Sequence, residues 1–454
     1  MASSILLTNA TLLVPSGEAN DYVVALRHHS LLIEGNKIVR ISSEIAPPSP
    51  HTEILDCTGK IISPGFIDTH HHLWQTQLKG RHANHTLMEY MSTAANGVEA
   101  TVASGIRSIF CYTPTIKLKA WKPELVPADD MLGNWVHKQL DEFATSAPWA
   151  DGRVHLGLAF DGYSLPKEVV IGLHERARKA GVKLITAHCV HGYFSDDSLV
   201  DIIDSYGLLG PDFLLSHATN LTEGDVEKLR KANAWISSTP DTELQMGMGN
   251  PVCFREGCTD ISSLGIDCHS NNSSSIPTQM RVALQCERAR RNDTTVAQGK
   301  YLRSLNVSVQ DAFKLGTIQG ARAIHMDNKV GSITAGKLAD LVIFDAQTPG
   351  MICASEEDPV AAIVLHSSIR DIDTVIVDGR ICKQNGRLVP VNVNTTLEDA
   401  VIAKQRVDWG EVAQQLLSSR RRIQAAIEKA GANDFEHMMS GTMKMLQIAE
   451  NKFV

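Results

Sequence analysis

Two histidines separated by a single residue are the first feature of this chain that could do chemistry. They end the stretch Pro64-Gly-Phe-Ile-Asp-Thr-His70-His-His72, which we interpret as an apolar strand that ends in histidine side chains. Side chains alternate across a strand, so His70 and His72 are expected to point to one side and His71 to the other. Neutral imidazoles suit zinc, iron and related ions. Three consecutive histidines are also compatible with a surface tract, so the motif needs partners.

Three further polar side chains lie at the ends of apolar, strand-like runs. Val182–His188 and Asp212–His217 end in histidine, and Ser263–Asp267 ends in a carboxylate. Each of these groups would destabilise an apolar strand by about 2–7 kcal/mol if it were left unpaired. One shared metal ion accounts for all of them, because barrel active sites form where the strands end. The sequence therefore predicts one metal centre.

The elements that position these residues follow from the hydrophobic periodicity. After Phe66, apolar runs alternate with helical patterns, which is typical of βα units and a parallel sheet. The strands predicted in this region are Ile106–Tyr112, Val154–Phe160, Val182–His188, Phe213–His217, Ala234–Thr239 and Ser263–Asp267. The predicted helices are Asp130–Thr145, Lys167–Ala180, Thr222–Lys231 and Thr278–Asn292.

Strand-rich segments bracket this central region. Residues 4–63 are predicted to form Ile5–Leu7, Val23–Leu26, Ser30–Glu34, Lys37–Ile41 and Lys60–Ile62. After Val309–Ala323, the predicted strands are Leu341–Phe344, Ile363–Leu365, Thr374–Val377 and Arg380–Lys383, and Glu398–Ala432 and Glu436–Glu450 are predicted to be helices. We expect a β domain from residues 1–63 and 330–395, a barrel from 64–329 and C-terminal helices from 396–454.

Composition restricts the class of protein. The 454 residues exceed one ordinary domain, and 43% hydrophobic with 21% charged residues is typical of globular chains. A net charge of −8 without a long Lys/Arg run argues against nucleic acid and anionic membranes as partners. No signal peptide, membrane span or paired cysteine spacing is evident, so we expect a cytoplasmic protein with reduced thiols. We expect a small-molecule substrate, and the sequence is compatible with a homo-oligomer as well as with a monomer.

The order HxH, His, His, Asp resembles the amidohydrolase superfamily. The entry motif at residues 64–72, Gly320-Ala-Arg-Ala-Ile and the stretch Val330–Asp345 resemble its cytosine deaminase and triazine hydrolase branch. The resemblance spans about residues 4–390 and implies an α/β fold, a distorted TIM (β/α) barrel with a small β-sandwich domain formed by both chain ends. It also implies one divalent metal ion, zinc or iron, on His70, His72, His188 and Asp267.

The chemistry that this resemblance implies is hydrolysis. A metal ion lowers the pKa of bound water towards about 7. Asp267 would take the proton and deliver it to a leaving nitrogen, and His217 would stabilise the oxygen of a tetrahedral intermediate. We expect cleavage of a non-peptide carbon–nitrogen bond in a small cyclic amide, amidine or amino-heterocycle. The alternatives are displacement of another leaving group from a heteroaromatic ring, and a truncated, non-catalytic relative.

Two departures from the family pattern bear on this expectation. Deaminases of the branch usually carry glutamate three residues after the strand-5 histidine, where this chain has His191. Histidine can also donate a proton, with a reference pKa of about 6.5, so we include His191 among the catalytic candidates. The substitution favours hydrolysis in which Asp267 alone moves the proton. The alternatives are that His191 marks a site for an anionic substrate or is only a loop residue.

The second departure is a missing strand unit. Only two strands are predicted between His72 and His188, whereas the barrel needs three. The strand-2 unit is not found near Ala94–Gly97, which raises the alternative of a shortened barrel with doubtful activity.

Several side chains near the motif are candidates for substrate binding. Trp74 and Gln75 follow the HxH pair at the barrel mouth, where an aromatic wall and an amide would suit a flat heterocycle. His269 and Asn271 lie on the loop after Asp267 and are further candidates. Cys268 directly follows Asp267, and strand alternation is expected to turn it towards packing.

Overall fold

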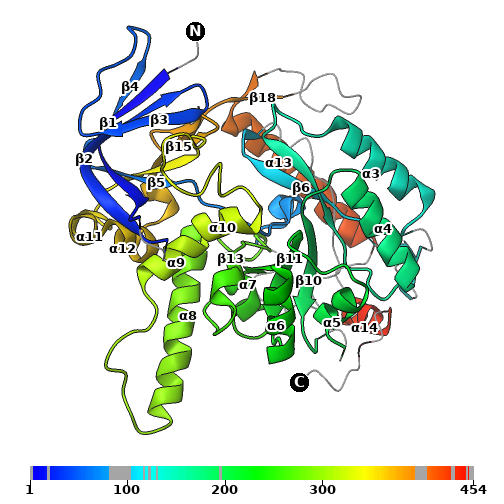
Figure 1. Ribbon diagram of the computed structural model, residues 1–454. Coiled ribbons are helices and arrows are strands. Elements are labelled where there is room, and N and C mark those ends of the chain that lie inside the picture. The colour runs from blue at the N-terminus through cyan, green and yellow to red at the C-terminus, as the bar shows by residue number, and fades with distance from the viewer. Residues whose placement is uncertain are drawn as a thin grey trace. The chain divides into compact units, whose positions relative to one another are not determined.

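The computed structural model describes residues 4–17, 21–80, 104–115, 118–120, 124–128, 131–193, 197–393, 406–430, 435–445 and 448 (Figure 1). It comprises two compact units. The first contains Met1–Thr69, Ser262–Ile266 and Ser273–Trp409, and the second contains His70–Ile261, Asp267–Asn272 and Gly410–Val454. The predicted metal ligands all belong to the second unit. The region of the strand-2 prediction, near Ala94–Gly97, lies outside the described residues.

Strands from both ends of the chain form one sheet in the first unit. Its order is β17-β16-β15-β14-β5-β1-β2-β3, with β4 also pairing with β1. β5 pairs with β14 in antiparallel register, Ile62 opposite Ile343, which joins the two ends directly. The N-terminal strands are β1 (Ser4–Pro15), β2 (Val23–Glu34), β3 (Lys37–Ser42), β4 (Glu53–Asp56) and β5 (Lys60–Pro64). The C-terminal strands are β14 (Leu341–Asp345), β15 (Ile372–Val377), β16 (Arg380–Gln384) and β17 (Arg387–Leu388).

One hydrophobic cluster holds this sheet together. Leu7, Leu31, Ile62, Leu341 and Ile376 are all buried in it, so residues distant in sequence share one core. In Figure 1 the blue N-terminal strands and the yellow β15 accordingly lie in the same part of the molecule. The second layer of the expected β-sandwich stays a prediction.

The remaining elements of the first unit are mostly helical. They are β13 (Ser262–Leu264), α8 (Ile276–Val296), α9 (Val309–Leu315), α10 (Ile318–Ala323), α11 (Ile352–Glu357), α12 (Pro359–Ala361), η3 (Ala362–His366), η4 (Ile369–Asp371), β18 (Val391–Asn392) and β19 (Arg406–Val407).

The second unit is built on parallel strands in chain order. β12, β11, β10, β9 and β6 are neighbours, and every pair whose register is defined runs parallel. Their bounds are β6 (Ser108–Tyr112), β9 (Val154–Ala159), β10 (Ile185–Val190), β11 (Phe213–Thr219) and β12 (Trp235–Ser238). A helix follows each of these strands in the chain, so the predicted alternation of strand and helix is present.

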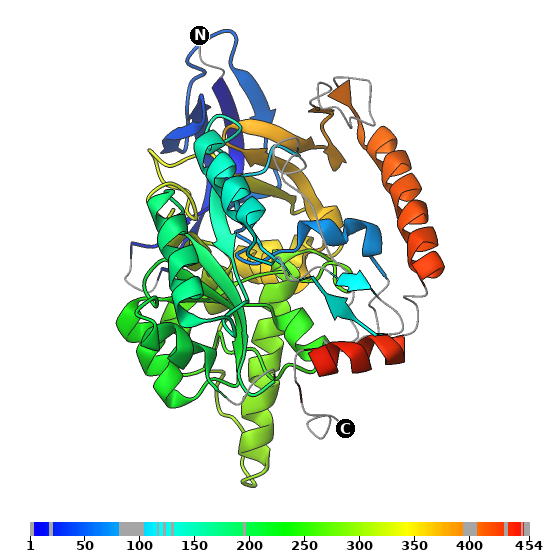
Figure 2. The same cartoon turned by 90° about the vertical axis from the view of Figure 1, so that its right-hand side faces the viewer.

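The helices of this unit carry the end signals expected from their sequences. They are η1 (Leu73–Leu78), α3 (Asn134–Ser146), α4 (Lys167–Lys179), α5 (Leu199–Ser205), α6 (Glu223–Ala232), α7 (Pro240–Gln245), η2 (Thr259–Ile261), α13 (Trp409–Ala430) and α14 (Phe435–Met445). α6 begins at a capping box of Thr222 and Asp225 and ends at Asn233 in the left-handed conformation. Figure 2 shows α13 and α14 as separate helices in orange and red. A short hairpin pairs β7 (Leu118–Ala120) with β8 (Val126–Pro127).

The structure corrects several predicted elements. Ile363–Leu365, predicted as a strand from its branched side chains, lies in the π-helix η3. Asp358 caps the preceding helical turn through the N–H groups of Val360 and Ala361, with Pro359 at its first position, and these helix-start signals override β propensity.

Three boundary errors have simpler causes. The two strands predicted within residues 23–34 are one strand, because pairing with β1 continues on both sides of an irregularity at which His28 adopts a φ of +55°. The predicted helix at 309–323 divides at Thr317 into α9 and α10. β13 ends at Leu264, so Asp267 lies beyond the strand rather than within it. None of the helices in the described ranges has both the length and the apolar composition needed to cross a membrane.

Candidate metal centre

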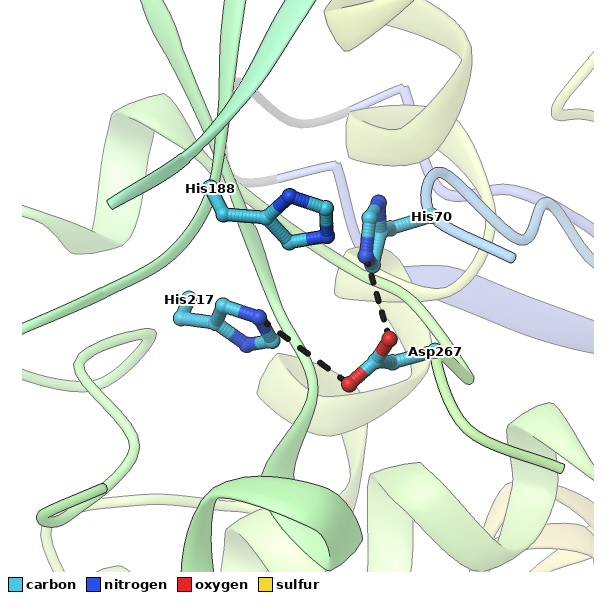
Figure 3. A group of neighbouring side chains, drawn as sticks. All are labelled: His70, His188, His217 and Asp267. Atoms are coloured by element: carbon cyan, nitrogen blue, oxygen red, sulfur yellow. Dashed lines mark ion pairs between the residues drawn. The ribbon is translucent and has the colours of Figure 1, made fainter. Parts of the chain in front are cut away.

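Five side chains predicted from the sequence converge in the second unit. The ligand atoms of His70, His188, His217 and Asp267 all lie within 4.8 Å of one another (Figure 3). Oδ1 of Asp267 lies 3.2 Å from Nε2 of His70 and 3.0 Å from Nε2 of His72. Nε2 of His188 is 3.3 Å from Nε2 of His72, and Nε2 of His217 is 3.9 Å from Oδ2 of Asp267. The structure therefore brings together the side chains that the sequence analysis grouped, while their roles as metal ligands and catalytic groups stay predictions.

Parallel backbone pairing brings the HxH motif to Asp267. His71 and Asp267 form an isolated parallel bridge, in which the N–H of Asp267 donates to the carbonyl of His70 and the N–H of His72 donates to the carbonyl of Asp267. His70 and His72 consequently flank the carboxylate from one direction. The ring of His71 instead stacks on His269, with centroids 4.5 Å apart, as the alternation of side chains predicts.

Three of the histidines are anchored through Nδ1, which leaves Nε2 facing the cluster. Each partner comes from a different part of the parallel sheet or the loop after it. The pairs are His70 with Ser216 Oγ at 2.8 Å, His188 with Asp161 Oδ2 at 2.8 Å, and His217 with Thr239 Oγ1 at 2.9 Å. Metal-binding histidines commonly use the second ring nitrogen in this way, because the partner fixes the ring orientation and the tautomer.

Burial and charge shape the ionisation of the centre. Burial lowers the pKa of His70 to about 3, so this ring is neutral near pH 7 and its nitrogens can serve as ligands. Burial raises the pKa of Asp267, but hydrogen bonds with His70 and His72 outweigh it and hold the pKa well below the usual range. Burial lowers the pKa of His188, yet the nearby Asp161 carboxylate holds it above the ordinary value. The Asp161 side chain is 52% exposed, so solvent screens part of that ion pair.

Two residues of the centre have strained backbone conformations. His217 has a φ of +68° and Asp267 a φ of +58°, in the left-handed region that favours glycine. Ala218, directly after His217, has a φ of +54°, and the pairing of β10 with β11 shifts register at the same place. Such strain costs about 1–3 kcal/mol per residue and persists where the surrounding structure holds it, often at functional sites.

The donor set fits a zinc-type ion. Ligands about 2.1 Å from a zinc ion in tetrahedral geometry are about 3.4 Å apart, and the contacts around Asp267 range from 3.0 to 3.9 Å. Imidazoles with one carboxylate are the donors that zinc and iron accept. His72, Asp267 and Cys268 form a second, overlapping group of potential ligand atoms. Cys268 itself also packs against Val190, Met246 and Met248, as expected from its sequence position.

One ring nitrogen of His191 lies near a carboxylate that is not part of the cluster around Asp267. Nδ1 of His191 is 3.6 Å from Oδ2 of Asp225, the buried residue of the α6 capping box. Asp225 also accepts a hydrogen bond from Ser198 Oγ and one from the N–H of Thr222. The catalytic role of His191, which was predicted because relatives carry glutamate at this position, stays a prediction.

The substrate-binding candidates have different surroundings. The amide of Gln75 is buried and holds the following loop, because Oε1 accepts from the N–H of Ser270 and Nε2 donates to Sγ of Cys268. His269 is buried, with Nε2 3.1 Å from Thr76 Oγ1. The side-chain amide of Asn271 has no hydrogen-bond partner within the described ranges. The side chain of Trp74 lies outside what the structure describes. Their roles in binding substrate stay predictions.

The supporting residues were mostly missed by sequence reasoning. Asp161 directly follows the predicted strand Val154–Phe160, which makes it only a weak candidate from sequence alone, and no pattern in the sequence singles out Ser216, Thr239 or Glu243. Ser216 immediately precedes His217 in β11, and Thr239 follows the end of β12. Their types are ordinary for strand ends, so no sequence signal marks them without the register of the sheet.

We expect Asp161→Asn to weaken zinc binding by about 10–100-fold. The asparagine can still accept the N–H of His188 but loses the charge that strengthens the contact with Nδ1. Because Asp161 raises the pKa of His188, zinc affinity in the native protein should keep rising with pH above about 6.5, and the rise should end at lower pH in the variant. Competition with a coloured chelator across about pH 6–9 measures both effects. Asp141→Asn, which breaks an exposed ion pair with Arg176, is the control, and identical curves for native protein and Asp161→Asn would contradict the expectation.

Comparisons with known proteins agree with this geometry. Residues 167–382 match the Amidohydrolase family. A 5'-deoxyadenosine deaminase from Methanobrevibacter smithii is 25% identical over 423 residues, covering 83% of this chain and 92% of the relative. A 5-methylthioadenosine/S-adenosylhomocysteine deaminase from Thermococcus sibiricus is 25% identical over 400 residues, covering 77% and 88%.

Solved structures agree at the level of the fold. A triazine hydrolase from Arthrobacter aurescens superposes with a TM-score of 0.69 at 16% identity, covering 85% of this chain and 96% of that one. An adenosine deaminase from Xanthomonas campestris with bound zinc gives 0.69 at 17% identity, covering 94% and 99%. The family match over residues 167–382 and the deaminase relatives agree with the resemblance to the amidohydrolase superfamily that the motifs predicted. They support the prediction of a hydrolase that acts on non-peptide carbon–nitrogen bonds.

Proposed function

We propose that this chain is a mononuclear, zinc-dependent deaminase of an amino-heterocycle, with 5'-modified adenosines as the first substrates to test. The observation that carries the proposal is the convergence of anchored histidines on Asp267, each held through Nδ1 by its own partner. The relatives from Methanobrevibacter smithii and Thermococcus sibiricus, which are named for deaminating adenosine derivatives, support the choice of substrate.

His70, His72, His188 and Asp267 would hold the ion, as the family pattern implies. A bound zinc ion lowers the pKa of a water molecule towards about 7 and so supplies a nucleophile near neutral pH. Oδ2 of Asp267 is the atom that can accept a proton, because Oδ1 is the oxygen that contacts both His70 and His72. The same oxygen would return the proton to the leaving nitrogen, so ammonia departs as a neutral molecule.

His217 and His191 are proposed to assist this proton transfer in two different ways. His217 is buried within reach of Asp267 and so can orient groups at the reacting carbon. His191 stands where relatives place an acid, and the carboxylate of Asp225 faces its Nδ1. This arrangement would present the other ring nitrogen, Nε2, to a ring nitrogen of the substrate.

The finer architecture belongs to the same proposal. We propose that the parallel strands of the second unit are part of a distorted (β/α) barrel, which is supported by their chain order and by the site at their carboxyl ends. The domain limits of 64–329 for the barrel and 1–63 with 330–395 for a β-sandwich are retained as proposals.

Ammonia release tests the function directly. Purified, zinc-loaded protein is incubated with 5'-deoxyadenosine, 5'-methylthioadenosine, adenosine, cytosine and a chlorinated or methoxylated triazine, and ammonia is measured. Release from an adenosine derivative, abolished by chelation, is the expected result. Zinc-loaded protein that releases only halide or alcohol from the triazine would favour the alternative of another leaving group. His191→Ala, tested in parallel, should slow deamination without loss of bound zinc.

A further inference from the structure

The C-terminal helix α14 packs against the segment that follows β6 in the chain. Gly441 of α14 comes so close to Leu125, beside β8, that a β-carbon at this glycine would lie 2.8 Å from Cγ of Leu125. Nζ of Lys444 lies 3.1 Å from Oε1 of Glu124. Both of these side chains are largely exposed, so solvent screens the ion pair and close packing at Gly441 is the more important contact.

The same helix packs against Tyr193, in the segment that follows β10. Met439 and Met443 are four residues apart and therefore lie on one face of α14. Met443 and Ile448 form a buried apolar cluster, and Met439 and Tyr193 pack against it. Met443 and Ile448 are each 7% exposed, so this contact is shielded from water. α14 therefore connects the segments after two strands of the parallel sheet.

Tyr193 also belongs to a second apolar cluster. The buried members of this cluster are Val190, Met246, Met248 and Cys268. Val190 lies two residues after His188 in the chain, and Cys268 directly follows Asp267. One tyrosine ring thus packs against the C-terminal helix and against residues that neighbour the candidate site.

The backbone of Tyr193 ends a tight turn that contains His191. The N–H of Tyr193 donates to the carbonyl of Val190 at 3.3 Å, which closes a turn of four residues. Gly192 has a φ of +76°, which favours glycine at the third position of such a turn. The N–H of His191 donates to the carbonyl of Thr219 at 3.1 Å, so β11 holds one side of the turn. The ring of Tyr193 anchors the other end between the two apolar clusters.

We propose that Tyr193 is a positioning residue for His191 and that α14 clamps Tyr193 in place, so that the approach of His191 to the substrate depends on the C-terminal helix. The inference rests on the proposed function, in which His191 meets a ring nitrogen of the substrate. A short turn with a glycine has several accessible conformations, and packing of the tyrosine ring selects one of them. Such selection matters for the rate, because displacing a reacting group by about 1 Å can slow a reaction about 10²-fold.

Substitutions of Tyr193 test the clamp through ammonia release from 5'-deoxyadenosine. Tyr193→Ala is expected to lower kcat by about 10²-fold while bound zinc is retained. Tyr193→Phe keeps the ring and should keep the native kcat. In a double-mutant cycle, Tyr193→Ala should cause no further loss once His191 is replaced by alanine, because the tyrosine acts through this histidine.

A second measurement follows the turn itself and has a matched control. Met443→Ala removes part of the clamp and should speed hydrogen–deuterium exchange at the N–H groups of His191 and Tyr193. Met326, in the first unit, is also 7% exposed and lies in a buried apolar cluster. Met326→Ala should lower the melting temperature, as Met443→Ala does, but leave kcat and exchange at the turn unchanged.

The possible outcomes separate the clamp from the proposed function. Native kcat and native exchange in Tyr193→Ala would overturn the clamp, and so would losses from Tyr193→Ala and His191→Ala that multiply in the double variant. Failure of the native protein to release ammonia would instead refute the proposed function. The exchange rates of Met443→Ala and Met326→Ala would then still decide whether α14 holds the turn.

Discussion

Replacing Asp267 with asparagine is expected to lower kcat by about 10²–10⁴-fold, the usual loss when a positioned proton carrier is removed. Asp267 is the carboxylate that contacts His70 and His72 through one oxygen and faces His217 with the other. Asparagine nearly preserves the shape but cannot take up the proton. Steady-state ammonia release at saturating substrate measures the effect.

The comparison must separate chemistry from metal loss. The variant is assayed with excess zinc, and its bound zinc is quantified in the same sample. Asp311→Asn, which disrupts the capping box of α9 in the first unit, serves as a control that should cost about 1 kcal/mol of stability without changing kcat. A zinc-loaded Asp267→Asn protein with more than a tenth of the native kcat would show that proton transfer does not depend on this carboxylate.

Removing the metal ion is expected to abolish turnover and to destabilise the protein. Binding to the folded state alone contributes about 4 kcal/mol when free zinc exceeds its Kd by 1,000-fold. The expected cause is local, because the ligand atoms of His70, His188, His217 and Asp267 lie within 4.8 Å of one another in the folded chain and are not gathered in this way in the unfolded chain. Melting temperature measured across zinc-buffered solutions should rise with free zinc.

Ion chemistry provides the control for this experiment. Zinc added back to the chelated protein should restore both activity and melting temperature, whereas magnesium should restore neither, because it prefers oxygen ligands in octahedral geometry. A melting temperature independent of zinc, together with turnover that survives chelation, would contradict a metal-dependent mechanism.

The sequence was informative about which side chains converge, because each of them lies in a local strand pattern, whereas the set of metal ligands is what the family resemblance implies. A two-residue spacing places His70 and His72 on one side of an extended chain, and the pairing of His71 with Asp267 preserves that geometry. His188 and His217 lie near the carboxyl ends of β10 and β11, as expected from their positions at the ends of apolar runs. These inferences depend only on strand periodicity.

The support around the ligands could not be predicted, because it depends on which residues of neighbouring strands lie side by side. Ser216 reaches His70, which is 146 positions away in the chain, and Asp161 reaches His188 across the pairing of β9 and β10. One-residue changes of register would present different side chains at these points. Glu243 is hidden for another reason, because a glutamate in a short helix is ordinarily an exposed residue.

The left-handed backbone at His217 and Asp267 also bears on how this protein could be altered. Backbone stability alone favours glycine or asparagine at a φ near +60°. The histidine and the aspartate at these two positions therefore supply side chains for the proposed site at the expense of backbone stability. Any redesign that ranks variants by stability, or that replaces residues according to backbone preference, would be drawn to change these two positions first. Thermostabilisation of this protein would therefore need both residues held fixed from the outset.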